Sequence, residues 1–171
     1  MSHAPAFVVV ALIALTTVPA ADAADPQPPR ACRQALDTRL PRWQLSPPPD
    51  DLAAYARQNK LTTNLIQADF DSNGSRDTAL LVIVPGSGNP NMRQYVAVCL
   101  TEGSRTRLQL IREPYCGDGI SVARRGTRVV DHQTEQPVTY WANGVSTYCF
   151  EKASGTYLYR DGQFVLVVDS D

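Results

Sequence analysis

An acidic loop between two apolar segments constrains this chain more than any other feature. Residues 69–77 read D-F-D-S-N-G-S-R-D, so oxygen-bearing side chains occupy loop positions one, three, five, seven and nine, and Gly occupies position six. Alternate side chains of such a loop can point inward at a hard cation, and the Gly permits a sharp turn. The flanking runs are short and apolar, and the run after the loop is β-rich, which predicts a loop between two strands.

The loop predicts one bound calcium ion. The expected ligands are the side chains of Asp69, Asp71, Asn73 and Asp77 and the backbone carbonyl of Ser75. Three carboxylates around a divalent ion suit calcium, whereas magnesium prefers to keep its waters. Position twelve is Leu80 and not the Glu of an EF-hand, so Asp77 is expected to close the site. The competing interpretation is a polar turn, because Asp, Asn, Ser and Gly are ordinary turn residues.

The stretch from Ala68 to Thr78 resembles the calcium loops of FG-GAP and VCBS repeats, whose pattern is roughly G-D-F-N-G-D-G-x-x-D-L. It departs from that pattern at Ala68, Asn73 and Thr78. The resemblance implies a calcium loop but no propeller, because the chain carries one copy and a propeller needs at least four blades. The whole chain also resembles small exported bacterial proteins of unassigned function that carry one such loop, which implies no activity.

The amino terminus predicts export to the periplasm or the exterior of the cell. Residues 6–18 are an apolar run too short to span a bilayer, and A-D-A follows at 21–23. This pattern is typical of a signal peptide, residues 1–23, cut after Ala23; a retained membrane anchor is the alternative. No other run is long and apolar enough to cross a membrane. The remaining chain has the length of one domain and balanced charge, which argues against nucleic-acid binding.

Four cysteines lie after the predicted cleavage site, and an even number in an exported chain predicts two disulfides. Their spacing does not match a zinc site, because the chain has no C-x-x-C motif. Three pairings are possible, and we favour Cys116–Cys149 together with Cys32–Cys99.

The expected fold class is α+β and mainly β, with one or two short helices near the amino terminus. A Pro-rich segment, residues 24–49, contains a possible helix over 32–40, and a single mainly-β domain follows over 50–171. A second helix is predicted over 51–59 with Asp50 as its N-cap. Strands are predicted over 78–84, 93–100 and 107–111.

Three turn signals divide the last third of the chain. Gly126, Gly144 and Gly162 follow Arg, Asn and Asp at a spacing of 18 residues, and each lies between β-rich runs. Asn-Gly and Asp-Gly are the strongest two-residue hairpin signals. The spacing therefore predicts hairpins over 120–130, 138–150 and 156–168, arranged as an antiparallel meander. The aromatic residues concentrated here either fill a core, which we favour, or form a surface that stacks on carbohydrate.

No catalytic constellation stands out. The one histidine after residue 23 is His132, which lies in a polar segment, and no serine lies in a G-x-S-x-G elbow. Asp118 is the most plausible catalytic carboxylate, although we expect it in a turn. We therefore expect a non-enzymatic domain that binds a protein or envelope component, with its oligomeric state open. The alternatives are a carboxylate-based hydrolase of cell-wall or polysaccharide substrates and a periplasmic inhibitor of a lytic enzyme.

Overall fold

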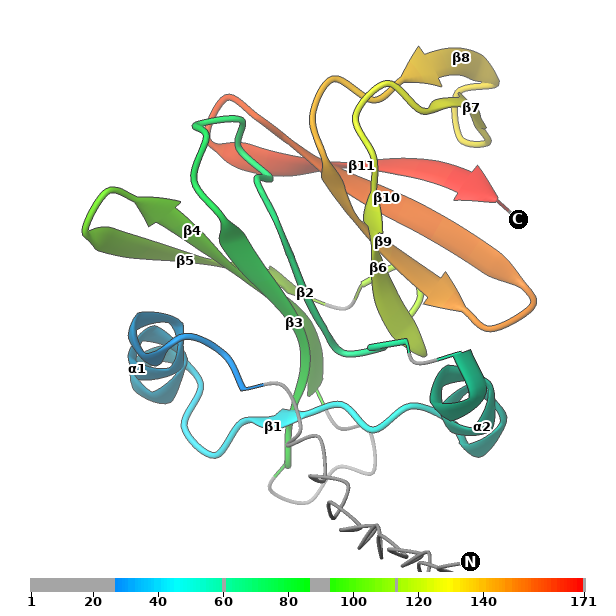
Figure 1. Ribbon diagram of the computed structural model, residues 1–171. Helices are drawn as coiled ribbons and strands as arrows, with labels where there is room; N and C mark the ends of the chain where they lie inside the picture. Colours follow the sequence, from blue (N-terminus) through cyan, green and yellow to red (C-terminus); the bar gives the residue numbers. More distant parts are fainter. Residues whose placement is uncertain (1–26, 60, 87–92, 113, 171) are drawn as a thin grey trace, which may run out of the picture.

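The computed structural model describes residues 27–59, 61–86, 93–112 and 114–170. The predicted signal peptide, residues 1–23, lies outside these residues. Within them the chain forms mostly antiparallel β-sheet and two short helices, so the mainly-β prediction is confirmed (Figure 1). The elements in chain order are α1 (Arg30–Arg39), β1 (Gln44–Leu45), α2 (Asp50–Asn59), β2 (Leu65–Ala68), β3 (Asp77–Val84), β4 (Arg93–Glu102), β5 (Arg105–Arg112), β6 (Gly119–Ala123), β7 (Arg128–Asp131), β8 (Gln136–Thr139), β9 (Gly144–Cys149), β10 (Ala153–Arg160) and β11 (Gln163–Ser170).

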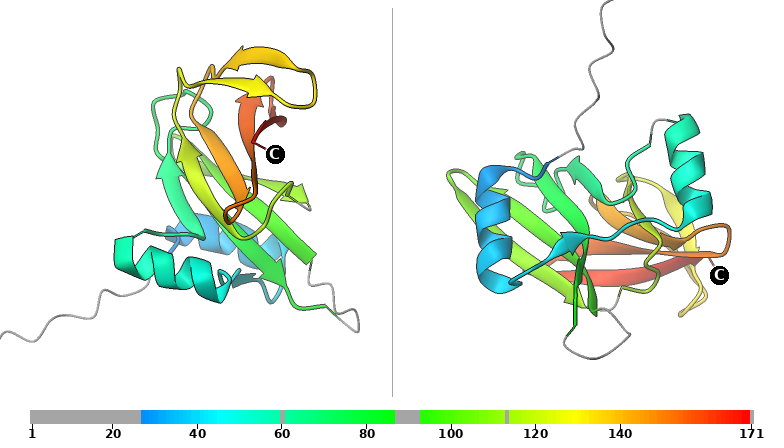
Figure 2. Two further views of the ribbon diagram at one scale, coloured as in Figure 1. Left: turned by 90° about the vertical axis from the view of Figure 1, so that its right-hand side faces the viewer. Right: turned by 90° about the horizontal axis from the view of Figure 1, so that it is seen from below.

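The first sheet, which we call sheet A, has the strand order β1-β3-β4-β5, and β2 also pairs with β3. Strand β3 lies inside the sheet, and its side chains are buried on both faces from Asp77 as far as Ile83. Its carboxyl-terminal part pairs with β1, and its amino-terminal part pairs with β2. The segment that contains β1 crosses below the sheets from α1 to α2 (Figure 2).

The second sheet, sheet B, has the order β11-β10-β9-β6, and β7 and β8 form a separate two-stranded sheet. The predicted hairpin over 156–168 is confirmed, with Tyr159 opposite Phe164 and Tyr157 opposite Leu166 across the Asp161-Gly162 turn. Asp161 and Gly162 both have positive φ, as that turn requires.

The other two predicted hairpins are wrong, and the predicted meander is not confirmed. Strand β6 pairs with β9 and not with β7, and β7 pairs with β8. The chain leaves sheet B after β6, and the backbone N–H of Gly126 then donates to the carbonyl of Tyr140, 2.9 Å away. Gly144 is the first residue of β9 and not a turn residue, and its φ is not positive.

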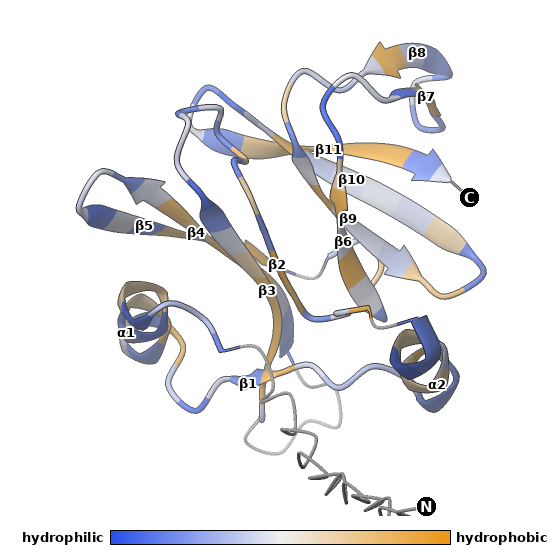
Figure 3. Ribbon diagram, viewed as in Figure 1, coloured by the Kyte–Doolittle hydropathy of each residue, from blue (hydrophilic) through white to orange (hydrophobic). Residues whose placement is uncertain are grey.

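The hydrophobic core has three parts, and Figure 3 shows the apolar residues concentrated in the strands. Helix α1 and the residue that follows it cover one face of sheet A through Leu36 and Leu40, which pack with Leu80 and Val82. A second cluster lies between the sheets, where residues of sheet A pack with Ile120 of β6 and Val145 of β9. In the third cluster, side chains of the β7–β8 sheet pack with Tyr140, Leu158 and Val167. Residues 27–45 therefore belong to the packed structure.

The favoured disulfide pairing is confirmed. Cys32 of α1 pairs with Cys99 of β4, with the two Cα atoms 5.6 Å apart, and Cys116 pairs with Cys149 at the end of β9, with a Cα separation of 5.0 Å. The first bond fixes α1 to sheet A, and the second fixes the segment before β6 to sheet B. Two disulfides fit an oxidising compartment.

The aromatic residues of the last third mainly contribute to packing. Tyr140 and Tyr157 are buried, and Tyr159 and Phe164 contact each other edge to face beside the core between the sheets. Trp141 donates its indole N–H to the carbonyl of Tyr159, and this arrangement favours the core interpretation over a carbohydrate-stacking surface.

Candidate metal centre

The acidic loop joins β2 to β3, as predicted. The two strands pair antiparallel, and Ala68, the last residue of β2, lies opposite Asp77, the first residue of β3. The loop between them reverses the chain at Ser72 and Gly74, whose φ values are +62° and +85°. Nothing lies within 4 Å of the position of a Cβ on Gly74, so its backbone conformation alone accounts for glycine there.

The loop is anchored by the phenylalanine between its first two acidic residues. Phe70 is fully buried in the core between the sheets. The residues on either side of it, Asp69 and Asp71, are only partly buried. Burial of Phe70 therefore fixes the backbone from which the two carboxylates project.

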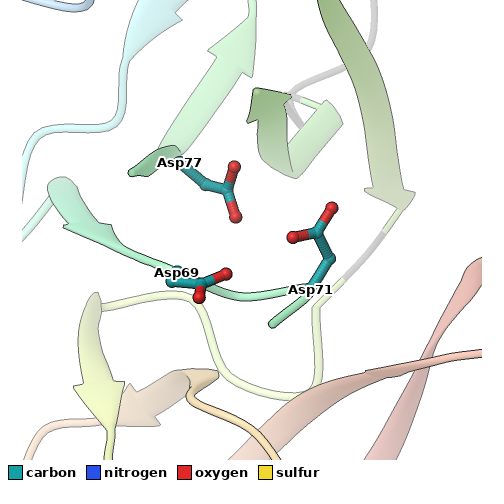
Figure 4. A group of neighbouring side chains, drawn as sticks. All are labelled: Asp69, Asp71 and Asp77. Carbon is teal, nitrogen blue, oxygen red and sulfur yellow. The ribbon is translucent and has the colours of Figure 1, made fainter. Parts of the chain in front are cut away.

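Three of the five predicted ligand residues come together. Asp69, Asp71 and Asp77 each offer a carboxylate oxygen, and these oxygens lie within 4.8 Å of one another. Figure 4 shows the three side chains around one space, with Asp77 projecting from the start of β3 and the other two from the loop. A set of oxygen ligands at this spacing suits a hard cation.

Backbone N–H groups hold the three carboxylates in place. Asp77 accepts hydrogen bonds from the N–H of Phe70 at 2.8 Å and the N–H of Thr101 at 2.7 Å. Asp69 accepts from the N–H of Asn73 at 3.1 Å and the N–H of Gly74 at 3.0 Å. Asp71 also accepts from the N–H of Asn73, at 3.2 Å. Such bonds orient a carboxylate and leave lone pairs free for a metal ion, as is usual for the residues that surround a metal site.

Asp77 is fully buried with no cationic side chain beside it. Among the described residues the structure contains one ion pair, between Arg107 and Glu102. Burial raises the pKa of Asp77, and the charges of Asp71 and Asp69 raise it further, whereas the N–H groups of Thr101 and Phe70 lower it. Burial is also the main reason that the pKa of Asp71 is raised. The charge of Arg107 lowers the pKa of Asp71, but this effect is smaller than that of burial. Buried carboxylates are normally paired or bound to a metal, and among the described residues no cationic side chain forms an ion pair with this cluster.

Asn73 has a second role that the sequence did not reveal. Its side-chain amide donates to Asp71 at 3.1 Å and to the carbonyl of Thr101 at 2.9 Å, and its amide oxygen accepts the N–H of Ser75 at 2.7 Å. Asn73 thus ties the loop to the end of β4. Metal ligation by the Asn73 amide oxygen, and by the carbonyl of Ser75, stays a prediction.

Two residues distant in sequence complete the surroundings of the site. Thr101, at the end of β4, binds Asp77 through its N–H and the carbonyl of Arg76 through its hydroxyl. Asn143, just before β9, donates its side-chain amide to the carbonyl of Asp69 at 3.1 Å. The loop pattern gives no signal for either residue, because the Thr101 contact depends on the pairing of β4 with β3 and the Asn143 contact depends on how the sheets pack.

Asp118 and His132, the residues considered for catalysis from the sequence, both lie outside the acidic loop. Asp118 accepts the N–H of Phe150 at 2.9 Å, so it holds the start of the turn after β9. His132 is exposed in the turn between β7 and β8. Neither residue belongs to the acidic group in the loop.

No protein-family model, curated protein or solved structure matches the chain. In the described part of the chain, neither helix has the length and apolar character needed to span a membrane.

Proposed function

We propose that the protein is an exported, non-enzymatic binding domain whose fold is completed by one structural calcium ion in the loop of residues 69–77. The observation that carries the proposal is the buried carboxylate of Asp77, which lies beside Asp69 and Asp71 without a cationic side chain. Three carboxylates supply enough charge for a divalent cation, and their oxygen donors favour calcium over softer metals.

The position of the loop supports a structural role for the ion. The loop contacts β4 through Thr101 and the segment before β9 through Asn143, so it links sheet A to sheet B. Without a cation the three carboxylates repel one another at this junction. An ion bound only by the native state would stabilise that state and leave the rest of the fold unchanged.

The two disulfides support the location of the domain outside the cytoplasm. The roles of Asp118 and the exposed position of His132 support a binding role over catalysis. The partner we propose is a protein or another component of the cell envelope.

Calorimetric titration with calcium tests the metal site. We expect one calcium ion per chain, no saturable heat with magnesium at the same concentration, and loss of binding in Asp77→Ala or Asp71→Ala. Ser75→Ala serves as the matched control within the loop, because the proposed ligand there is the backbone carbonyl. Absence of saturable calcium binding by the folded wild type would overturn the proposal. For the binding role, capture from an envelope fraction by the folded protein in calcium should give one reproducible partner.

A further inference from the structure

A small pocket lies at the end of β3 that is remote from the acidic loop. Its volume is about 370 Å³. Its lining comprises Arg39, Leu40, Pro41, Val84, Arg93, Tyr95, Leu110 and Arg112. The lining therefore combines apolar groups with three arginines, and the calcium proposal uses none of these residues.

The strand register explains the pocket. Val84 lies opposite Arg93, and Tyr95 lies opposite Arg112, so these positions share the face of sheet A that α1 covers. Helix α1 ends at Arg39, and the following Leu40 packs with Val84, Tyr95 and Leu110. Beyond that point the helix no longer covers the sheet, and the exposed ends of the strands leave the hollow.

The arginines around the hollow lack carboxylate partners among the described residues. The one ion pair in that part of the chain joins Arg107 to Glu102. Arg93 and Arg112 occupy diagonal positions on adjacent strands, where side chains come within reach of each other and like charges are unfavourable. Arg39 also lies in the last turn of α1, where a cation offsets the partial charge of the helix end. Arg93 and Arg112 lie in strands and not at a helix end.

The surrounding segments are strongly basic although the whole chain is nearly neutral. Residues 27–45 and 93–112 together carry eight arginines and two acidic residues, whereas the full chain has a formal net charge of −1. Of these arginines, Arg39, Arg93 and Arg112 line the pocket, and their charge raises the local concentration of anions there. Guanidinium groups bind carboxylate and phosphate oxygens with charge-assisted hydrogen bonds.

We propose that this pocket binds an oxyanion head, carboxylate or phosphate, carried on a short apolar stem. The guanidinium groups of Arg93, Arg112 and Arg39 bind the head, and the stem lies against Tyr95 and Leu110. The volume is at the small end of the range for ligand pockets, which limits the stem to a short chain. The pocket lies at the opposite end of β3 from Asp77, so binding does not require calcium.

The test uses hexyl phosphate and hexanoate as probes in calorimetric titration and NMR shift mapping of the folded protein. The two probes distinguish a phosphate from a carboxylate head. Inorganic phosphate, which lacks the stem, and 1-hexanol, which lacks the charge, are the matched controls. We expect saturable binding of at least one charged probe, shifts at Val84, Tyr95 and Leu110, and at least about tenfold weaker binding of both controls.

The double variant Arg93→Gln, Arg112→Gln should weaken probe binding by about tenfold or more. Arg105→Gln is the matched control, because Arg105 is exposed on β5 but does not line the pocket, and its binding should equal wild type. Both variants should keep the wild-type melting temperature or exceed it, since the replaced side chains are exposed. The proposal is overturned if neither charged probe binds at millimolar concentration, if 1-hexanol binds equally well, or if the double variant binds like wild type. We expect the charged probe to bind with equal affinity in calcium and in chelator. Failure of the calcium proposal would therefore leave probe binding unchanged.

Discussion

The side-chain amide of Asn143 donates a hydrogen bond to the backbone carbonyl of Asp69, although 74 residues separate them in the chain. The amide oxygen of Asn143 also accepts the N–H of Arg125 at 3.1 Å. One side chain therefore connects the acidic loop of sheet A to the point where the chain leaves sheet B.

Asn143→Ala should lower the free energy of unfolding by about 1–2 kcal/mol, because it removes both hydrogen bonds. It should also weaken calcium binding, because Asp69 loses its fixed backbone position. Urea denaturation and calcium titration measure the two effects. Asn59→Ala is the matched control, since Asn59 is exposed and its side-chain amide donates to the carbonyl of Tyr55 within its own helix. An Asn143→Ala variant equal to this control in both measurements would contradict the proposed link.

Gly144→Ala should destabilise the protein by about 1–3 kcal/mol. A Cβ at this position would lie 2.5 Å from Cγ2 of Thr156 and 2.8 Å from Cδ2 of Leu158. Both atoms belong to β10, which pairs with β9 inside sheet B. Thermal unfolding measures the loss, and a variant as stable as wild type would show that β9 and β10 do not approach this closely.

Tyr140 should make the protein lose stability at alkaline pH. Burial raises the pKa of its hydroxyl above the usual range, and the hydrogen bond to Asp169 raises it further. Because the folded-state pKa exceeds the unfolded value of about 10, the contribution is complete below pH ~10 and is lost as the pH rises above it. Tyr148 and Tyr157, whose pKa values are also raised by burial, add to this loss.

Tyr140→Phe should therefore show a smaller fall in unfolding free energy between about pH 9 and pH 11 than wild type does. Urea denaturation at several pH values in this range measures the slope. The variant removes the hydroxyl that contacts Asp169 and Thr156 but keeps the ring in its core position. Equal slopes for the two proteins would show that Tyr140 ionises equally easily in the folded and unfolded states.

Local sequence patterns were sufficient to predict part of this fold. Strand β3 and the loop before it follow from an apolar run and from alternate oxygen-bearing side chains, and the structure contains both. The turn at Asp161-Gly162 was predicted because the backbone conformation that it needs is set by those two residues alone.

Local patterns failed where a residue makes its decisive contacts far away in the chain. Asn143-Gly144 has the composition of a hairpin turn, yet Asn143 bonds to Asp69 and Gly144 permits close contact with β10. The pairing of β6 with β9 likewise joins two strands that are separated in sequence by β7 and β8, which form their own sheet. In the candidate metal centre, the sequence pattern predicts the three aspartates but not Thr101, because the role of Thr101 arises from the position of β4 beside the loop.

The most direct test of the structural calcium site is the melting temperature of the protein without residues 1–23, measured in calcium, in magnesium and in chelator. With calcium at a hundredfold excess over its dissociation constant, binding to the native state alone adds about 2.7 kcal/mol to the free energy of unfolding. For a domain of this length that corresponds to a rise of roughly 5–10 °C. We predict this rise in calcium for wild type and Ser75→Ala, and none in magnesium at the same concentration or for Asp71→Ala. Equal wild-type melting temperatures in calcium and chelator would contradict the account and reduce the loop to a polar turn.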